Sequence, residues 1–136
     1  MIRRPPRSTL SSSSAASDVY KRQGNAHITA ALAMREHAES IAGRERLAIE
    51  AFARSLEAVP ATLIANSGNN MLDGLLELRS MVRNESPSSG INAEGKPMEL
   101  TDVWECCDTI LHGLEAACET ACGLLRVDQV ISARGD

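Results

Sequence analysis

Apolar residues three or four positions apart recur along most of this chain, and this helical spacing limits the fold more than any other feature. The repeating stretches end near residues that interrupt helices, such as Gly43, Pro60 and Gly68. We therefore predict a mainly α-helical body. The expected helices cover residues 28–41, 44–59, 61–66, about 69–83 and 108–125.

Three shorter stretches favour extended structure. Residues 86–95 are rich in serine, glycine and proline and are expected to form a loop that holds a short hairpin. Residues 103–107 should form a brief extended piece, and the β-branched tail at 127–131 an edge strand. The predicted fold class is thus mainly α with a small β-hairpin and an edge strand. Only 2% of the residues are aromatic, and a core of aliphatic residues suits helix–helix packing.

The first 23 residues differ from the rest in composition and charge. They carry five basic residues, one acidic residue, a proline pair and a run of four serines. They lack the ~7–15 apolar residues of a secretory signal, and the prolines and serines also leave no amphipathic helix for a mitochondrial presequence. We expect residues 1–23 to be a translated sequencing-adaptor read-through. The protein's own domain would then cover residues 24–136 and be truncated at about Gly24.

The remaining residues, 24–136, are acidic, with nine basic and 17 acidic side chains. Because phosphate backbones bind basic surfaces, this balance argues against nucleic acid as a partner. No stretch approaches the ~20 apolar residues of a membrane span, so no membrane partner is expected. The length of 136 residues suits one domain. Without a secretory signal, we expect this domain to be soluble and cytoplasmic.

The four cysteines raise the possibility of a metal or redox site. Cys106 and Cys107 are adjacent, whereas Cys118 and Cys122 lie one helical turn apart on an apolar stripe, and no CxxC pair occurs. Buried thiols behave as small hydrophobic side chains, and we prefer this interpretation to a zinc site. The three histidines form no recognisable triad. Among the acidic residues Glu105 is different, because it follows the loop in an apolar context where a carboxylate could accept ligand hydroxyls.

Five segments of the body, in order, resemble one protein family. They read GRERLAIEAFA at 43–53, LEAVP at 56–60, TLIANSG at 62–68, LELR at 76–79 and LRVDQVI at 125–131. The family is the group II chaperonins, that is, the archaeal thermosomes and the eukaryotic cytosolic TCP-1 ring complex. The resemblance spans nearly all of residues 24–131 and indicates the C-terminal part of the equatorial domain. Residues 24–28 look most like the epsilon subunit, whereas residues 127–129 look more like theta.

This resemblance implies a subunit of a double-ring ATPase that encloses and folds non-native proteins. Its partners would be the other ring subunits and unfolded client proteins. Three residues carry over to the nucleoside side of the ATP site. Glu105 aligns with an acidic residue that contacts the ribose, and Asn92 aligns with a position near the nucleoside that is usually aspartate. Gly24 would be the last of a three-glycine turn that approaches the ribose, although its two companions are replaced here.

The resemblance also implies what this chain lacks. In the family, the phosphate-binding segment and the carboxylates that place metal and water lie upstream of the matched region. ATP with Mg²⁺ is therefore the cofactor expected of an intact subunit, but we expect no catalytic residue, no metal ligand and no ATP hydrolysis in this chain. The segment 93–102 is also a few residues short. The competing hypotheses are a stand-alone helical interaction module without a nucleotide role, and a cysteine-based metal or redox protein.

Overall fold

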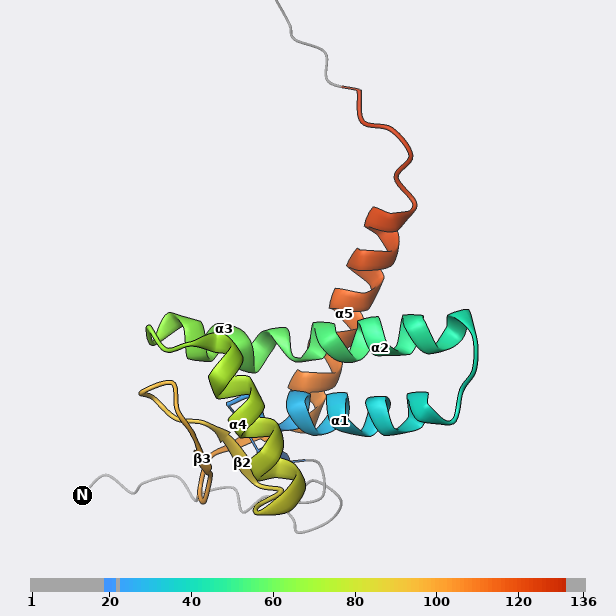
Figure 1. The fold of residues 1–136 in the computed structure, drawn as a ribbon. Coiled ribbons are helices and arrows are strands. Elements are labelled where there is room, and N and C mark those ends of the chain that lie inside the picture. Colours follow the sequence, from blue (N-terminus) through green and yellow to red (C-terminus); the bar gives the residue numbers. More distant parts are fainter. Residues whose placement is uncertain (1–18, 22, 132–136) are drawn as a thin grey trace, which may run out of the picture. The chain divides into compact units, whose positions relative to one another are not determined.

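The computed structural model describes residues 19–21 and 23–131. The chain divides into two compact units, and the larger one covers Tyr20–Glu105 while the smaller one contains the last helix. Each unit is described on its own. The elements, in chain order (Figure 1), are β1 (Val19–Lys21), α1 (Asn25–Glu39), α2 (Arg44–Leu56), α3 (Ala58–Asn66), α4 (Met71–Asn84), β2 (Ser89–Ile91), β3 (Pro97–Glu99), β4 (Trp104–Cys106) and α5 (Cys107–Leu125).

Helices α1 and α2 lie side by side (Figure 1). Alanines are buried on both of them, namely Ala31 and Ala38 on α1 and Ala53 on α2. Side chains this short let two helices approach closely. Helical spacing within residues 44–59 would place Leu47, Phe52 and Leu56 on one apolar face, but only Leu56 of these is buried, whereas Leu47 is 64% exposed and Phe52 is 39% exposed. The helical period identified the helix but not the side of it that packs.

The junction between α2 and α3 also differs from the expectation. Instead of one helix through residue 59, α2 ends at Leu56 and α3 begins at Ala58. Glu57 joins them with helical dihedral angles, at φ −68° and ψ −12°. Pro60 is the third residue of α3, where a backbone N–H has no partner within the helix. The proline therefore costs this helix no hydrogen bond.

Helix α4 begins directly after a capping asparagine, Asn70. The Asn70 side-chain oxygen accepts hydrogen bonds from the backbone N–H groups of Leu72 (2.9 Å) and Asp73 (3.3 Å). These two donors would otherwise lack partners at the start of the helix. Gly68, with φ +79°, ends the preceding turn in a left-handed conformation. The predicted interruption of the helices at Gly68 is confirmed.

The predicted hairpin forms from β2 and β3, although β3 lies just beyond the expected residues 86–95. The two strands are antiparallel, with Ser89 opposite Glu99 and Ile91 opposite Pro97. The extended piece expected near residues 103–107 is β4, and it pairs with β1. Within the described residues, regular structure is thus already present at Val19–Lys21, ahead of the expected boundary at Gly24. The remainder of the expected read-through, apart from Gln23, lies outside the described residues, and its origin stays a prediction.

The core of the larger unit joins four elements that are distant in sequence. Ile28 of α1, Ile64 of α3, Leu78 and Val82 of α4, and Ile91 of β2 form one buried cluster. Four of these side chains, at positions 28, 64, 78 and 91, are fully buried. Burial of a side chain of this size contributes roughly 1.5–3 kcal/mol relative to exposure. This cluster holds the start of α1 against the hairpin.

Helix α5 belongs to the smaller unit. None of its residues, all of which the structure describes, is buried, and Leu124 and Leu125 are 70% and 85% exposed. The interpretation of the cysteines as core residues is therefore wrong: Cys106 and Cys122 are exposed, and Cys118 is only partly covered. Within the described residues, no helix combines the length and apolar character that crossing a bilayer requires.

The tail after α5 corrects another expectation. Residues 127–131, all of them described, form no strand. β-branched residues favour extended backbone, but a strand also needs a neighbouring strand to complete its hydrogen bonds. Val130 and Ile131 are accordingly 83% and 84% exposed. Sequence propensity alone was not enough for an edge strand here.

Candidate functional site

Gly24 lies in a buried turn at the start of α1. Its φ of +82° is a left-handed conformation that glycine adopts at little cost. A side chain at this position would also collide with α3, because a Cβ atom would lie 2.8 Å from the Cβ atom of Pro60. The glycine is therefore required by packing as well as by conformation. Its carbonyl accepts the first helical hydrogen bond of α1, from Ile28 (3.0 Å).

Gln23, directly before this glycine, is also left-handed, with φ +59°. Side chains other than glycine, asparagine and aspartate rarely adopt this region, which marks a locally strained backbone. A hydrogen bond from the Ile91 N–H to the Gln23 carbonyl (3.0 Å) ties the turn to β2. This bond ties the turn that contains Gly24 to the strand that leads into Asn92.

Asn92 begins the turn between β2 and β3. Its side-chain oxygen accepts hydrogen bonds from the backbone N–H groups of Glu94 (3.1 Å) and Lys96 (2.8 Å). Its carbonyl also accepts one from Gly95 (3.0 Å). The oxygen is therefore committed to the hairpin turn. The amide nitrogen is the group of this side chain that can meet a ligand.

Glu105 is a half-buried residue of β4. Its carboxylate acts electrostatically on His27, which lies three residues after Gly24. Burial lowers the pKa of His27 below its ordinary value of 6.5, and the negative charge of Glu105 opposes this effect only in part. His27 is therefore mostly neutral at pH 7. The start of α1 has a neutral imidazole and a carboxylate close to the Gly24 turn.

These groups fit one side of a nucleoside site. A carboxylate accepts hydrogen bonds from sugar hydroxyls, and an amide nitrogen donates one. They do not fit a metal site: within the described part of the chain, no three His, Cys, Asp or Glu side chains converge on a common point.

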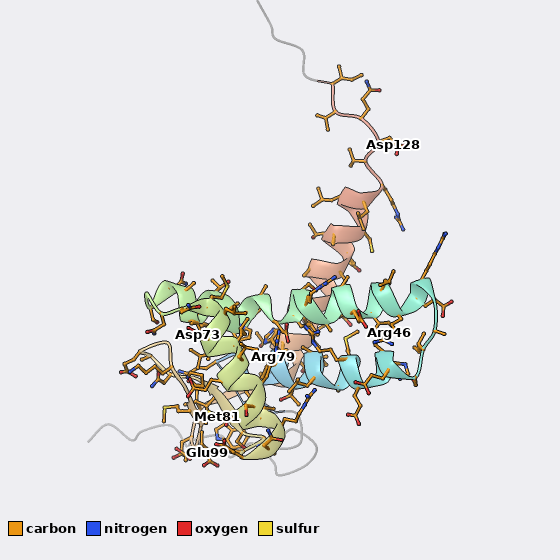
Figure 2. All side chains as sticks on the ribbon, in the orientation of Figure 1. Arg46, Asp73, Arg79, Met81, Glu99 and Asp128 are labelled. Atoms are coloured by element: carbon orange, nitrogen blue, oxygen red, sulfur yellow. The ribbon has the colours of Figure 1, made fainter. Side chains whose placement is uncertain are left out.

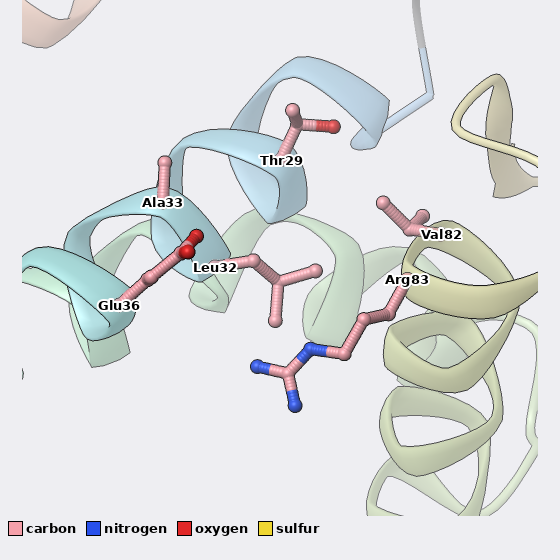
Figure 3. Close-up of a pocket in the computed structure, with 6 residues that line it drawn as sticks. All are labelled: Thr29, Leu32, Ala33, Glu36, Val82 and Arg83. Carbon is pink, nitrogen blue, oxygen red and sulfur yellow. The ribbon is translucent and has the colours of Figure 1, made fainter.

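An open pocket lies elsewhere in the larger unit. It has a volume of about 200 Å³ and is lined by α1 and α4. In Figure 3 the side chains of Leu32 and Arg83 extend toward each other from these two helices. Gly24, Asn92 and Glu105 are not among its lining residues, which also include Thr29, Ala33, Glu36 and Val82.

The sequence interpretation missed the role of Glu57. This carboxylate is only 5% exposed at its side chain, and it accepts hydrogen bonds from Arg35 of α1 (2.8 Å) and, at two atoms, from Arg79 of α4 (2.8 and 2.6 Å). Arg79 is labelled on α4 in Figure 2. Burial raises the pKa of Glu57, but the bonds from both arginines outweigh it and lower the pKa below the ordinary value. The sequence signal that could have revealed this role was a carboxylate that stands between apolar residues at the junction of two helices.

Comparison with known proteins adds an independent observation. The model of the TCP-1/cpn60 chaperonin family matches residues 24–135. Thermosome subunit alpha of Halobacterium salinarum is 38% identical over 106 residues, which are 76% of this chain and 19% of that protein. Thermosome subunit beta of Archaeoglobus fulgidus is 36% identical over 115 residues, which are 82% and 21%. This chain thus spans about a fifth of the length of these relatives.

A solved structure agrees. The open-state monomer of a group II chaperonin from Methanococcoides burtonii superposes with a TM-score of 0.74 at 30% sequence identity. The match covers 80% of this chain and 28% of that one. The similarity therefore extends from the sequence to the arrangement of the helices.

Proposed function

Because this chain belongs to the TCP-1/cpn60 chaperonin family, we propose that it supplies the nucleoside side of the ATP site in a group II chaperonin subunit. The intact subunit would fold non-native proteins inside a double ring. The observation that supports this proposal is the hydrogen bond between Ile91 and Gln23, which ties the Gly24 turn to the strand that leads into Asn92.

Each of three residues has a role in this proposal. The Gly24 backbone forms the floor against which the sugar rests, and the Asn92 amide nitrogen donates a hydrogen bond to the nucleoside. The Glu105 carboxylate accepts hydrogen bonds from the ribose hydroxyls. Because His27 is mostly neutral near pH 7, it does not neutralise that carboxylate.

The phosphates and Mg²⁺ would be held by parts of an intact subunit that this chain does not contain. When bound, Mg²⁺ neutralises charge that develops on the phosphate oxygens during transfer. The residues at the start of α1 contribute orientation of the nucleoside alone. We therefore expect this chain to bind adenosine weakly and to show no ATPase activity.

Adenosine titration, followed by backbone NMR of the whole chain, tests this proposal. The Gly24 and Asn92 amide signals should shift, and Glu105→Gln should weaken binding roughly tenfold, the cost of one hydrogen bond to a charged group. Glu99→Gln is the matched control, because Glu99 is an exposed carboxylate on β3. If adenosine shifts no signal near α1, or if both variants bind equally, the nucleoside role is wrong.

The partner proposal is separate. We propose that further chaperonin subunits and unfolded clients bind the intact protein in the cytoplasm, and that the epsilon subunit is the nearest eukaryotic relative. A thermosome subunit lacking the segment equivalent to residues 24–135 should regain assembly when this chain is added. Unchanged elution of the truncated subunit in size-exclusion chromatography would contradict this expectation.

One observation favours the alternative of a stand-alone helical interaction module: the larger unit has its own core cluster. On this alternative, the chain would be a monomer that unfolds cooperatively and has no effect on the truncated subunit. Analytical ultracentrifugation and urea unfolding distinguish the two cases.

A further inference from the structure

Asn25, the first residue of α1, is a polar side chain that is only 6% exposed. Its amide nitrogen donates two hydrogen bonds, to the carbonyl of Pro87 (2.8 Å) and to that of Ser89 (2.6 Å). The two acceptors are more than 60 residues away in sequence. One side chain thus connects the start of α1 to the strand that leads into Asn92.

The position of Asn25 explains why this connection matters for the turn. The Gln23 carbonyl is bonded to Ile91 on one side of Gly24, and the Asn25 side chain is bonded to Ser89 on the other. Both bonds end on β2. Gly24 lies between these two attachments, and the strained left-handed residue before it, Gln23, makes the first of them. Strained backbone persists where its surroundings over-determine it.

We propose that Asn25 is a positioning residue, which holds the Gly24 turn in the conformation that binds the nucleoside. This inference rests on the proposed function. Asn25 acts through Gly24 and not on the ligand, because its amide is buried and already donates to two carbonyls.

The chemistry of the contact makes the inference specific. Both partners are carbonyl oxygens, so residue 25 must donate, and aspartate of the same shape has no hydrogen to offer. In Asn25→Asp, the carboxylate would face two carbonyl oxygens in a buried position, which is unfavourable. In Asn25→Ala, the two carbonyls would lose their donor without an added charge.

Asn70→Asp is a matched control for this change. Asn70 uses its side-chain oxygen as an acceptor for two backbone N–H groups, and a carboxylate accepts the same bonds. The control therefore adds the same negative charge to the chain while its hydrogen bonds are kept. A general effect of charge would appear in both variants, whereas loss of a donor would appear only at position 25.

Hydrogen exchange of the Ile91 amide tests the tie to the turn. Asn25→Asp and Asn25→Ala should each speed this exchange roughly tenfold, the effect of losing about one hydrogen bond, while Asn70→Asp should leave it unchanged. In the unmodified chain, the Asn25 side-chain amide should exchange more slowly than that of Asn84, which is exposed. Equal exchange of these two side chains would overturn the inference even if neither variant folds.

Adenosine binding tests the functional half. Affinity should fall in both Asn25 variants and stay unchanged in Asn70→Asp, at equal helix content by circular dichroism. If the unmodified chain binds adenosine and the Asn25 variants bind equally well, the positioning role is wrong although the proposed function stands. If the unmodified chain binds no adenosine, both the proposed function and the positioning role are wrong. This holds whatever hydrogen exchange shows about the bond between Ile91 and Gln23.

Discussion

At the scale of single residues, Glu57 illustrates how a buried charge is stabilised. Taking a carboxylate out of water is unfavourable, and the cost is recovered only if other groups bond to it well. Arg35 and Arg79 do so from two different helices, and their side chains are each 31% exposed. Each arginine thus keeps part of its contact with water, whereas the carboxylate has replaced nearly all of its water contacts with hydrogen bonds to the two arginines.

Replacement of Glu57 by glutamine should destabilise the larger unit. The substitution removes the charge and one of the acceptor oxygens. We expect the free energy of unfolding to fall by about 2 kcal/mol. This is less than the usual cost of breaking a fully buried ion pair, because the arginines stay partly hydrated. Urea unfolding followed by circular dichroism measures this loss. Glu50→Gln is the control, since the Arg46–Glu50 pair (2.7 Å) is on the surface and should give no measurable change. Equal stability of the two variants would contradict the role of Glu57.

His27 should make stability depend on pH. Burial holds its pKa in the folded state below the unfolded value of 6.5, so the unfolded chain binds the proton more readily. The free energy of unfolding should therefore fall as the pH drops below 6.5, until the pH is below the folded pKa of His27. In His27→Gln this part of the fall should disappear, as measured by urea unfolding between pH 7 and pH 5. His112→Gln, at an exposed position, should keep it.

At the scale of elements, the β2–β3 hairpin is fixed by contact with the turn between α3 and α4. The side-chain amide of Asn69 donates to the carbonyl of Glu94 (2.6 Å). Gly95, at the tip of the hairpin, approaches Ser67 so closely that a Cβ atom would collide with the Ser67 side chain. The hairpin that carries Asn92 is therefore held at its tip as well as along β2.

Gly95→Ala should test this contact. Gly95 has φ +74°, so alanine would be strained there, and its methyl group would also need the α3–α4 turn to move. We expect the two effects together to lower the free energy of unfolding by roughly 3 kcal/mol. Gly68→Ala is a close comparison, because φ is +79° and nothing lies within 4 Å of the added carbon. It should lose only about 1 kcal/mol. Equal losses in urea unfolding would mean that the hairpin tip is not tightly docked.

At the scale of the whole molecule, large apolar side chains are exposed in both units. In the larger unit, Leu47 and Leu72 are each 64% exposed, and in the smaller one Leu125 is 85% exposed. Exposed apolar side chains favour contact with other protein or self-association where they gather into patches. We expect the chain to associate with itself at micromolar concentration.

Charged residues on α5 should reduce this association. The double variant Leu124→Lys and Leu125→Lys replaces two exposed leucines at the end of the helix, so it should lower the average mass in analytical ultracentrifugation without changing helix content. Thr120→Lys, on the same helix, adds charge without removing an apolar group and should have a smaller effect. A chain that is monomeric at every concentration would contradict this prediction.

The family and most of the helices could be predicted from the sequence because they depend on local features. Periodic apolar residues specify a helix, Asn70 caps one, and serine, glycine and proline near residue 90 specify a turn. The fold class follows from these signals. The candidate residues Gly24, Asn92 and Glu105 came from ordered motifs along the chain, and their ligand role stays a prediction.

What only the tertiary structure decided depends on contacts between distant residues. Helical spacing does not say which side of α2 is covered, so Leu47 and Phe52 were assigned to a face that the structure exposes. Nor does it pair Glu57 with Arg35 and Arg79, each 22 positions away. The tail at 127–131 has strand propensity but no strand, because the hydrogen bonds of a strand are completed only by a neighbour in space.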